Sequence, residues 1–277
     1  MPELPEVETV IRGLARALSG KRLLRLDLAR PDLRSAIPKD LARTVEGRRV
    51  EGFSRRAKYI LMHVERGGVL IAHLGMSGRL VLTAPGTAPP RAKHDHAVFS
   101  FDDGTELRLN DARRFGLLDY TEATALDEHP RFRHLGLEPL SNGFSGPVLA
   151  ERLRGKKTSL KAALLDQRLI AGLGNIYACE ALFGARLSPR RLAGTVKGDR
   201  AERLAGAIRD VLTRAIAAGG SSLRDYVQAS GELGYFQHHW AVYGKEGEPC
   251  PGCDCRAGIS RITQAGRSTF YCAKRQR

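Results

Sequence analysis

The sequence predicts an α+β protein in which a strand-rich first half is followed by a helical second half and a cysteine-rich tail. Short β-type runs alternate with turn signals up to residue 120, helical periodicity takes over after residue 145, and four cysteines fall within residues 250–272. Strands grouped before helices are typical of α+β proteins. A chain of 277 residues is long enough for two domains with cores of their own.

The chain is strongly basic. It has 45 Lys and Arg against 30 Asp and Glu, a net charge of +15 and a pI near 10.1. A pI above about 9 is typical of nucleic-acid-binding domains, although a ribosome-associated or membrane-surface protein would share this charge. The sequence has no long apolar run and no signal peptide, so we expect a cytoplasmic protein that makes no contact with a membrane.

The chain begins Met1-Pro2-Glu3-Leu4-Pro5-Glu6. An initiator methionine is usually removed before a small residue, which would leave Pro2 as a free secondary amine. An α-amino group titrates near pH ~8, so part of it is neutral and nucleophilic at physiological pH. Attack on an aldehyde-like carbon would give an iminium ion, with the two glutamates close enough to transfer protons. The alternative is a disordered tail leading into a helix.

A helix is expected from Val7 to Leu18, because four apolar residues recur on one face and Gly20 stands just past the end. Its positive N-terminal end would lie close to the Pro2 amine and disfavour the protonated form.

The strands that follow are predicted from apolar runs separated by turn signals such as Asp102-Asp103-Gly104. We expect them at residues 23–28, 49–53, 59–64, 68–73, 80–83, 97–101, 106–109 and 117–120. Many short strands at a spacing of about ten residues are typical of a sandwich or a barrel. Three prolines make residues 85–91 an exposed loop.

Several loops of this half carry candidate functional groups. A basic cluster that ends in Lys58 precedes a strand, where such clusters are often only a solvated edge. A glycine-bounded turn at 73–78 would present Met76, which in isolation is more often a packing residue. Residues His94-Asp95-His96 offer half of a metal site or merely surface histidines.

The loop at 110–116 adds Arg113 and Phe115. Together with Met76 they offer three kinds of group. Met76 is an apolar side chain that can wedge between bases, Arg113 has a guanidinium that can donate several hydrogen bonds, and Phe115 has a ring that can stack. Such groups fill the gap that remains when an enzyme flips a nucleotide out of a duplex.

The second half begins near residues 139–143, and we place the connection at about 130–145. Helical segments at 159–170 and 175–183 bracket Ala171-Gly172-Leu173-Gly174, with Asn175 expected at the N-cap. A basic run upstream, made of Lys156, Lys157 and Lys161, favours an anion site at this helix N-terminus. The alternative is a plain helical hairpin with a glycine turn.

A further helix is expected at 200–218 and is followed by a long polar stretch from Gly219 to Phe236. Long loops of this kind are usually functional or disordered. Cys179, within the helix at 175–183, is expected to be a buried small residue.

The cysteine-rich tail predicts a zinc site. Two CxxC pairs separated by a hairpin-length spacer would be a strong signal, but Arg275 occupies the position of the fourth cysteine. We expect Cys255 to replace it. One structural Zn²⁺ would then be held by Cys250, Cys253, Cys255 and Cys272. A degraded, metal-free site is the alternative.

The chain resembles the formamidopyrimidine-DNA glycosylases, bacterial enzymes that excise oxidised purines such as 8-oxoguanine. The resemblance rests on MPELPEVETV at the N-terminus, RRAKY at 55–59, the arginine-phenylalanine loop at 110–116 and LLDQRLIAGLGNIYACEALF at 164–183. The family's loop motif usually reads Asp-Pro-Arg-Arg-Phe, and Ala112 replaces its proline here. Cys179 stands where aspartate or serine is common.

The resemblance implies a two-layer β-sandwich with flanking helices at 1–130 and a linker at 131–145. A helix-two-turn-helix domain at 146–242 and a zinc-finger β-hairpin at 243–277 would follow. A loop at about 220–236 is expected to close over the lesion. The family also implies a monomer that acts on duplex DNA with an oxidised purine opposite cytosine, and that is associated with the bacterial nucleoid.

In activity, the resemblance implies a bifunctional glycosylase and AP lyase. The residues that it assigns to catalysis are Pro2, Glu3, Lys58 and Arg267, with Glu6 as a supporting carboxylate. Those that it assigns to DNA contacts are His73, His94, Arg113, Lys156, Lys161 and Asn175. The residues that would fill the gap in the duplex are Met76, Arg113 and Phe115. Two rivals are an endonuclease VIII-like enzyme for oxidised pyrimidines and a lesion-binding protein without catalysis.

Overall fold

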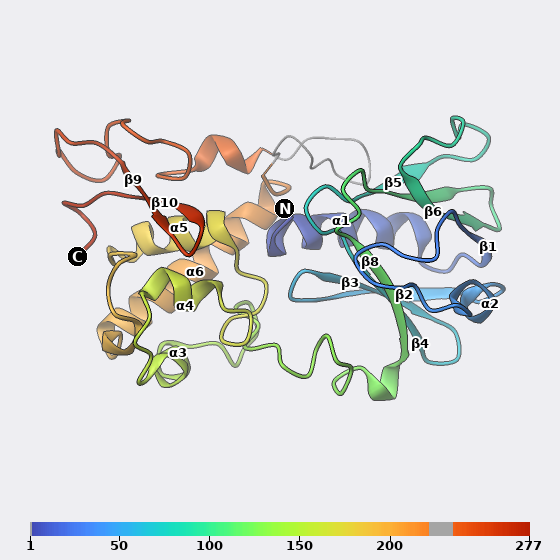
Figure 1. The fold of residues 1–277 in the computed structure, drawn as a ribbon, viewed down its shortest axis with the longest axis horizontal. Helices are drawn as coiled ribbons and strands as arrows, with labels where there is room; N and C mark the ends of the chain where they lie inside the picture. Colours follow the sequence, from blue (N-terminus) through green and yellow to red (C-terminus); the bar gives the residue numbers. More distant parts are fainter. Residues whose placement is uncertain (1, 222–234) are drawn as a thin grey trace. The chain divides into compact units, whose positions relative to one another are not determined.

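The computed structural model describes residues 2–221 and 235–277, which divide into two compact units (Figure 1). Unit 1 comprises residues 1–133 and 218–235, and unit 2 comprises residues 134–217 and 236–277. The expected lesion-covering loop at about 220–236 lies largely outside the described residues. The described residues at the two ends of this loop belong to unit 1, apart from Phe236. The cysteine-rich hairpin belongs to unit 2, with the helices.

Unit 1 begins with helix α1, Leu4–Leu18. It starts three residues earlier than predicted because Glu3 is its N-cap and forms a capping box with Glu6. Pro5, which interrupts most helices, is tolerated here in the first turn. The helix ends before Gly20, whose φ of 84° requires a residue without a side chain.

Unit 1 also contains two antiparallel four-stranded sheets, in the orders β1-β6-β7-β5 and β2-β3-β4-β8. The strands are β1 Leu23–Leu28, β2 Val50–Arg56, β3 Tyr59–Val64, β4 Gly68–His73, β5 Arg79–Thr83, β6 Asp95–Phe101, β7 Glu106–Asn110 and β8 Leu117–Glu122. Side chains from both sheets and from α1 share one apolar core. The predicted β-sandwich is therefore confirmed, and all eight strands lie where the periodicity places them.

Two short elements of unit 1 were not predicted from the sequence. They are helix α2, Leu41–Val45, and the 3₁₀ turn η1, Ala123–Ala125. A helix of five residues is too short to show a helical period.

Unit 2 contains four α-helices and a β-hairpin. They are α3 Gly146–Leu153, α4 Leu160–Leu165, α5 Asn175–Gly184, α6 Asp199–Ala217, β9 Ser260–Gln264 and β10 Arg267–Tyr271, with 3₁₀ turns η2 Ala193–Thr195 and η3 Phe236–His239. α5 is buried along nearly its whole length and contacts α4, α6 and β10 (Figure 1).

Two sequence predictions in unit 2 are wrong in detail. The N-cap of α5 is Gly174, and Asn175 is its first helical residue. α4 ends at Leu165 instead of continuing to Ile170. Cys179 is 1% exposed among apolar neighbours, so the prediction of a buried small residue is confirmed.

None of the helices in the described part of the chain has both the length and the hydropathy that crossing a membrane requires.

Candidate active site and metal centre

The N-terminus of α1 places two carboxylates beside Pro2. Pro2 is buried, and Glu3 and Glu6 are only 4% and 2% exposed. Glu6 uses both oxygens: Oε2 accepts the Glu3 backbone N–H at 2.9 Å, and Oε1 accepts the Ser221 backbone N–H at 2.8 Å. Two backbone donors hold this carboxylate in one position.

Gly220 and Ser221, at the start of the predicted lesion-covering stretch, therefore belong to this N-terminal group, and their contact with Glu6 was not predicted from the sequence. Gly220 has a φ of +81°, and a Cβ on it would lie 3.2 Å from Cγ of Glu6. Ser221 also forms an isolated bridge with Tyr235, so the two ends of the segment between them are joined. Only the run of two glycines and two serines hinted at this turn.

Lys58 stands in the tight turn between β2 and β3, where Ala57 has a φ of 53°. The lysine is 7% exposed. Its neighbour Tyr59 pairs with His73 across β3 and β4, and the two rings lie 4.8 Å apart. The sheet thus brings together two residues, Lys58 and His73, that are distant in the sequence.

His73 is neutral at physiological pH. Burial, followed by the positive charges of Lys58, Arg34 and Arg131, lowers its pKa from 6.5 to about 4. Its Nδ1 accepts the Gly75 N–H at 2.9 Å, so the proton of the neutral ring is on Nε2. That N–H is the donor that the ring can offer to a ligand. Arg34 and Arg131, which the sequence did not single out, add two positive charges that act on His73.

The loops that carry Met76, Arg113 and Phe115 are interlocked through Asp111. This carboxylate is fully buried; Oδ1 accepts from Ser77 Oγ at 2.6 Å and Oδ2 accepts from the Gly116 N–H at 2.8 Å. The Ser77 bond joins the two loops, and the Gly116 bond closes the 110–116 loop on itself.

Within these loops the three candidate side chains remain accessible. The guanidinium of Arg113 lies 4.8 Å from the ring centroid of Phe115, which is 43% exposed, and Met76 is half-buried. A Cβ on Gly75 would lie 2.3 Å from the backbone of Phe115, so the close approach of the loops requires glycine there. Ala112 is exposed, and the loop forms without the proline of the family motif.

The His94-Asp95-His96 segment supports the same loop, and within the described part of the chain it belongs to no cluster of metal-binding side chains. His96 Nε2 donates to the Asp111 carbonyl oxygen at 2.8 Å, and Asp95 is paired with Arg108 at 3.4 Å. His94 is half-buried, and its carbonyl accepts from the Asp111 N–H at 3.0 Å.

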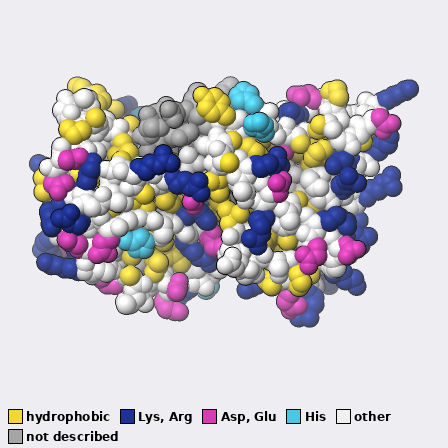
Figure 2. Space-filling view, turned by 180° about the vertical axis from the view of Figure 1, so that it is seen from behind, with side chains coloured by type: hydrophobic (Ala, Val, Ile, Leu, Met, Phe, Trp, Pro, Cys, Tyr) yellow, Lys and Arg dark blue, Asp and Glu magenta, His cyan; other side chains and the backbone are white. Residues whose placement is uncertain are grey.

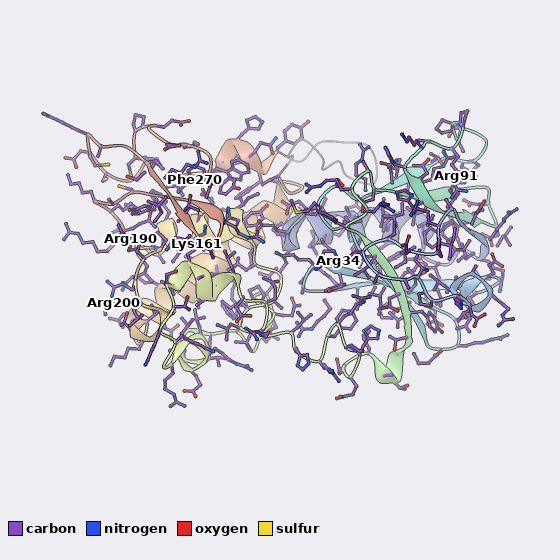
Figure 3. The ribbon with its side chains drawn as sticks, in the orientation of Figure 1. Arg34, Arg91, Lys161, Arg190, Arg200 and Phe270 are labelled. Carbon is purple, nitrogen blue, oxygen red and sulfur yellow. The ribbon has the colours of Figure 1, made fainter. Side chains whose placement is uncertain are left out.

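In unit 2, Lys161 and Asn175 converge on the strand that begins with Arg267. Lys161 is 0% exposed, and its Nζ donates to the Ser268 carbonyl at 2.9 Å and to Thr269 Oγ1 at 2.6 Å (Figure 3). Asn175 Nδ2 donates to the same carbonyl at 2.9 Å. The expected phosphate contact of Lys161 stays a prediction, and it would have to exchange a hydrogen bond already made to the hairpin.

The β9–β10 hairpin presents Arg267 on an exposed corner. Its two-residue turn consists of Ala265 and Gly266, with φ of 48° and 71°, as a type I′ turn requires. Lys156 is also exposed, upstream of α4.

Tyr243 is a candidate that the sequence reasoning missed. Its hydroxyl lies 3.4 Å from Asn175 Nδ2, and its ring packs edge-on against Phe270 at 5.1 Å. Glu180, on α5, holds the preceding turn by accepting the N–H groups of residues 241, 242 and 243 at 2.7–2.9 Å. No local motif signals this contact, because its partners are about 60 residues apart.

The four cysteines of the tail form one cluster. The Sγ atoms of Cys250, Cys253, Cys255 and Cys272 all lie within 4.8 Å of one another. Thiolates at the corners of a tetrahedron with Zn–S bonds of about 2.3 Å are about 3.8 Å apart, so the cluster fits a metal ion. Across residues 2–221 and 235–277, it is the one group of His, Cys, Asp and Glu with this geometry.

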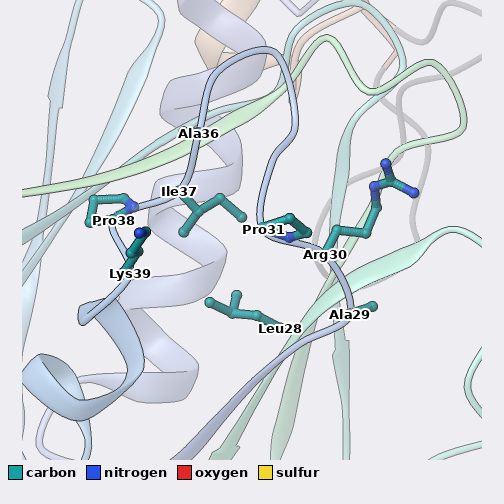
Figure 4. Close-up of a pocket in the computed structure, with 8 residues that line it drawn as sticks. All are labelled: Leu28, Ala29, Arg30, Pro31, Ala36, Ile37, Pro38 and Lys39. Carbon is teal, nitrogen blue, oxygen red and sulfur yellow. The ribbon is translucent and has the colours of Figure 1, made fainter.

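Basic side chains are widespread on the face shown in Figure 2. A pocket of about 460 Å³ in unit 1 lies elsewhere, between residues 28–31 and 36–39, and none of the predicted site residues lines it (Figure 4). Its wall is mostly apolar, and the guanidinium of Arg30 points away from Leu28 and Ile37.

Comparisons with known proteins match this geometry to one family. The family model of the formamidopyrimidine-DNA glycosylase N-terminal domain matches residues 1–118, and that of the family's H2TH domain matches residues 135–227. The formamidopyrimidine-DNA glycosylases of Rhodospirillum centenum and Brucella ovis are 57% and 53% identical to the chain, over 100% of each sequence.

Comparison with solved structures identifies the same family. The crystal structure of the MutM (Fpg) protein of Thermus thermophilus has a TM-score of 0.88 and 41% identity, over 99% of this chain and 98% of that one. The Lactococcus lactis Fpg bound to DNA containing N7-benzyl-Fapy-dG has a TM-score of 0.90 and 34% identity, over 100% of both chains. The chain therefore belongs to the formamidopyrimidine-DNA glycosylase family.

Proposed function

We propose that the chain is a bifunctional DNA glycosylase and AP lyase of base excision repair that removes oxidised purines from duplex DNA. The observation that carries this proposal is the N-terminal group of unit 1. There, Pro2 is buried beside Glu3, and Glu6 is fixed by two backbone N–H groups. Membership of the family supports the same chemistry.

The nucleophile is the Pro2 amine, which becomes available when Met1 is removed. Its nitrogen bonds to C1′ of the damaged nucleotide as the bond from C1′ to the base breaks, and the base leaves with a proton. Glu3 assists the opening of the sugar ring and later proton transfers. The bonded nitrogen then loses its proton, and its lone pair expels the ring oxygen O4′, which leaves as a hydroxyl group with a proton from Glu3. Breaking of the C1′–O4′ bond gives an iminium ion, which is the electron sink for the next steps.

Strand cleavage follows by two eliminations. The iminium acidifies C2′, so removal of a proton there expels the 3′-phosphate, and a second elimination expels the 5′-phosphate. Lys58 and Arg267 stabilise the charge of these phosphates or protonate them. No organic cofactor is needed for this sequence.

Met76, Arg113 and Phe115 fill the gap that the everted nucleotide leaves. The interlocked loops support this role, because an inserted wedge must keep its position against the tendency of the bases to restack. Arg113 would bond the cytosine that has lost its partner. His73, His94, Lys156, Lys161 and Asn175 would bind phosphates, and Tyr243 joins them on the strength of its contact with Asn175.

The four-cysteine cluster holds one structural Zn²⁺. The distances between its sulfur atoms suit a tetrahedral ion, and all four ligands come from the protein, as in structural rather than catalytic zinc sites. Zinc there would stabilise the hairpin that carries Arg267.

Oxidised pyrimidines are the second candidate substrate. The Lactococcus lactis enzyme has been solved with DNA containing an oxidised pyrimidine as well as with abasic-site DNA. We propose oxidised purines over oxidised pyrimidines as the substrate, because the chain begins Pro-Glu-Leu-Pro and has the separated methionine, arginine and phenylalanine. A monomer that acts in the cytoplasm, on the nucleoid, remains our expectation.

Borohydride trapping tests the proposal. The protein is incubated with a duplex containing 8-oxoguanine opposite cytosine, and in parallel with an oxidised-pyrimidine duplex. We expect a covalent adduct mainly with the purine lesion, and a weaker one with Pro2→Gly, which lacks the ring. Tight binding without an adduct on either duplex would contradict catalysis, and a stronger adduct on the pyrimidine duplex would reverse the substrate assignment.

A further inference from the structure

Arg275 occupies the position at which a second CxxC pair would have its last cysteine, and its side chain makes contacts of its own. Its backbone N–H donates to Cys272 Sγ at 3.4 Å, and its Nη1 donates to the Gly252 carbonyl oxygen at 2.7 Å. The guanidinium also lies 4.9 Å from the ring centroid of Phe183, near the end of α5. One residue thus links the C-terminal turn, the segment between Cys250 and Cys253, and the helix beneath them.

The fit between Arg275 and Gly252 is close. A Cβ on Gly252 would lie 2.6 Å from Cζ of the arginine, which is closer than real Cβ contacts occur. The position therefore requires glycine while the guanidinium is in place. Phe183, on the other side, is 8% exposed, so the cation lies over a ring that is fixed in the core of unit 2.

These contacts act on the part of the chain that supplies three of the four cysteines. With the carbonyl of Gly252 held, the short loop brings Cys253 Sγ to 3.5 Å and Cys255 Sγ to 3.4 Å from Cys272 Sγ. Four thiolates around one Zn²⁺ carry a net negative charge. Arg275 adds a positive charge to this part of the chain, whereas a cysteine at position 275 would add a further thiolate.

We propose that Arg275 is a positioning residue of the metal site. It clamps Gly252 against Phe183, and it thereby allows Cys255 to complete a four-thiolate set that lacks the second cysteine of its C-terminal pair. This inference rests on the metal site of the proposed function and is independent of the glycosylase chemistry.

The test measures metal, not activity. The full chain is purified with zinc, its zinc content is determined, and the rate of release to a chromogenic chelator is recorded for the wild type, Arg275→Ala, Arg275→Lys and Gly252→Ala. Residues that support metal ligands typically contribute 10–100-fold to affinity. We expect zinc release to be at least about 10-fold faster for Arg275→Ala and Gly252→Ala than for the wild type. Arg275→Lys should have an intermediate rate, because lysine keeps the positive charge but lacks the planar guanidinium.

Lys274→Ala is the matched control. Lys274 is the neighbour of Arg275 in the C-terminal turn, and it pairs with Asp254 at 2.6 Å. Both side chains are exposed, so Lys274→Ala should release zinc at the wild-type rate.

A double variant distinguishes a clamp from a general loss of stability. If Arg275 acts by gripping Gly252, Arg275→Ala combined with Gly252→Ala should release zinc no faster than either single variant. Additive effects, or release from Arg275→Ala at the wild-type rate, would overturn the proposal. A wild-type chain without bound zinc would instead refute the metal site itself. Circular dichroism identifies any variant that fails to fold, and the remaining variants still decide the question.

Discussion

The ammonium of Lys161 donates a hydrogen bond of 2.9 Å to the carbonyl oxygen of Ser268, the residue that follows Arg267. A fully buried lysine on α4 therefore fixes the strand that carries the arginine proposed to act on the phosphates. Asn175 donates to the same oxygen, so two helices hold the hairpin at one point.

Lys161→Met tests this support. The variant keeps the length of the side chain but removes the donor, and it leaves Thr269 Oγ1 without its 2.6 Å partner. We expect a loss of about 1–3 kcal/mol in the free energy of unfolding, measured in urea. Lys156→Met is the control, because Lys156 is exposed. It should weaken DNA binding and leave stability unchanged. Equal stability of the two variants would argue against a structural role for Lys161.

Glu6→Gln tests the positioning of the N-terminal group. Glutamine can accept only one of the two backbone N–H groups that Glu6 accepts, and its amide would direct a donor at the other. We expect a loss of about 100-fold in the rate of base excision, because small displacements of reacting groups have effects of that size. Glu151→Gln, at an exposed position on α3, should be unaffected. Full activity of Glu6→Gln would refute the positioning role.

His73 predicts a specific dependence of stability on pH. Its pKa falls from 6.5 to about 4 on folding, so between these values the unfolded chain binds a proton that the folded chain does not. Stability should therefore decrease as the pH falls through this window. Between pH 7 and pH 5 the contribution is about 2 kcal/mol.

His73→Asn isolates this contribution, because asparagine retains an acceptor for the Gly75 N–H but does not titrate. When the pH is lowered from 7 to 5, the free energy of unfolding in urea should decrease by about 2 kcal/mol less in the variant than in the wild type. The same loss in both proteins would show that His73 is not buried in its neutral form.

The basic charge predicts DNA binding that depends strongly on salt. If about five phosphates are contacted, the logarithm of the binding constant should fall with the logarithm of salt concentration with a slope of about −4 to −5. Fluorescence anisotropy on a labelled duplex measures this slope. Removing one contact, as in Lys156→Met, should make the slope shallower by about one. A slope near zero would contradict the electrostatic account.

The sequence predicted the strands well because each is a local pattern, and β1, β3 and β4 begin and end where their apolar runs do. Helix ends were less accurate. The N-cap of α5 was assigned to Asn175, a favoured capping residue, whereas the extended backbone of Gly174 caps the helix and the asparagine side chain reaches the hairpin instead.

Contacts between distant segments could not be predicted from local patterns. Glu6 and Ser221 are 215 residues apart, and Asp111 joins loops 34 residues apart at Ser77. Burial of Lys161 was missed for the same reason, since a lysine in a basic run normally remains in solvent. The candidate catalytic residues were found through family motifs, whereas the residues that hold them became visible only in the fold.

The most direct test of the account is to map the trapped adduct. The protein is reduced with borohydride on the 8-oxoguanine duplex and digested, and the peptide that carries the sugar remnant is sequenced by mass spectrometry. The account predicts a modification on the nitrogen of Pro2, in a chain that has lost Met1. A modification on Lys58, or an adduct formed by a chain that retains Met1, would contradict the assignment of the nucleophile.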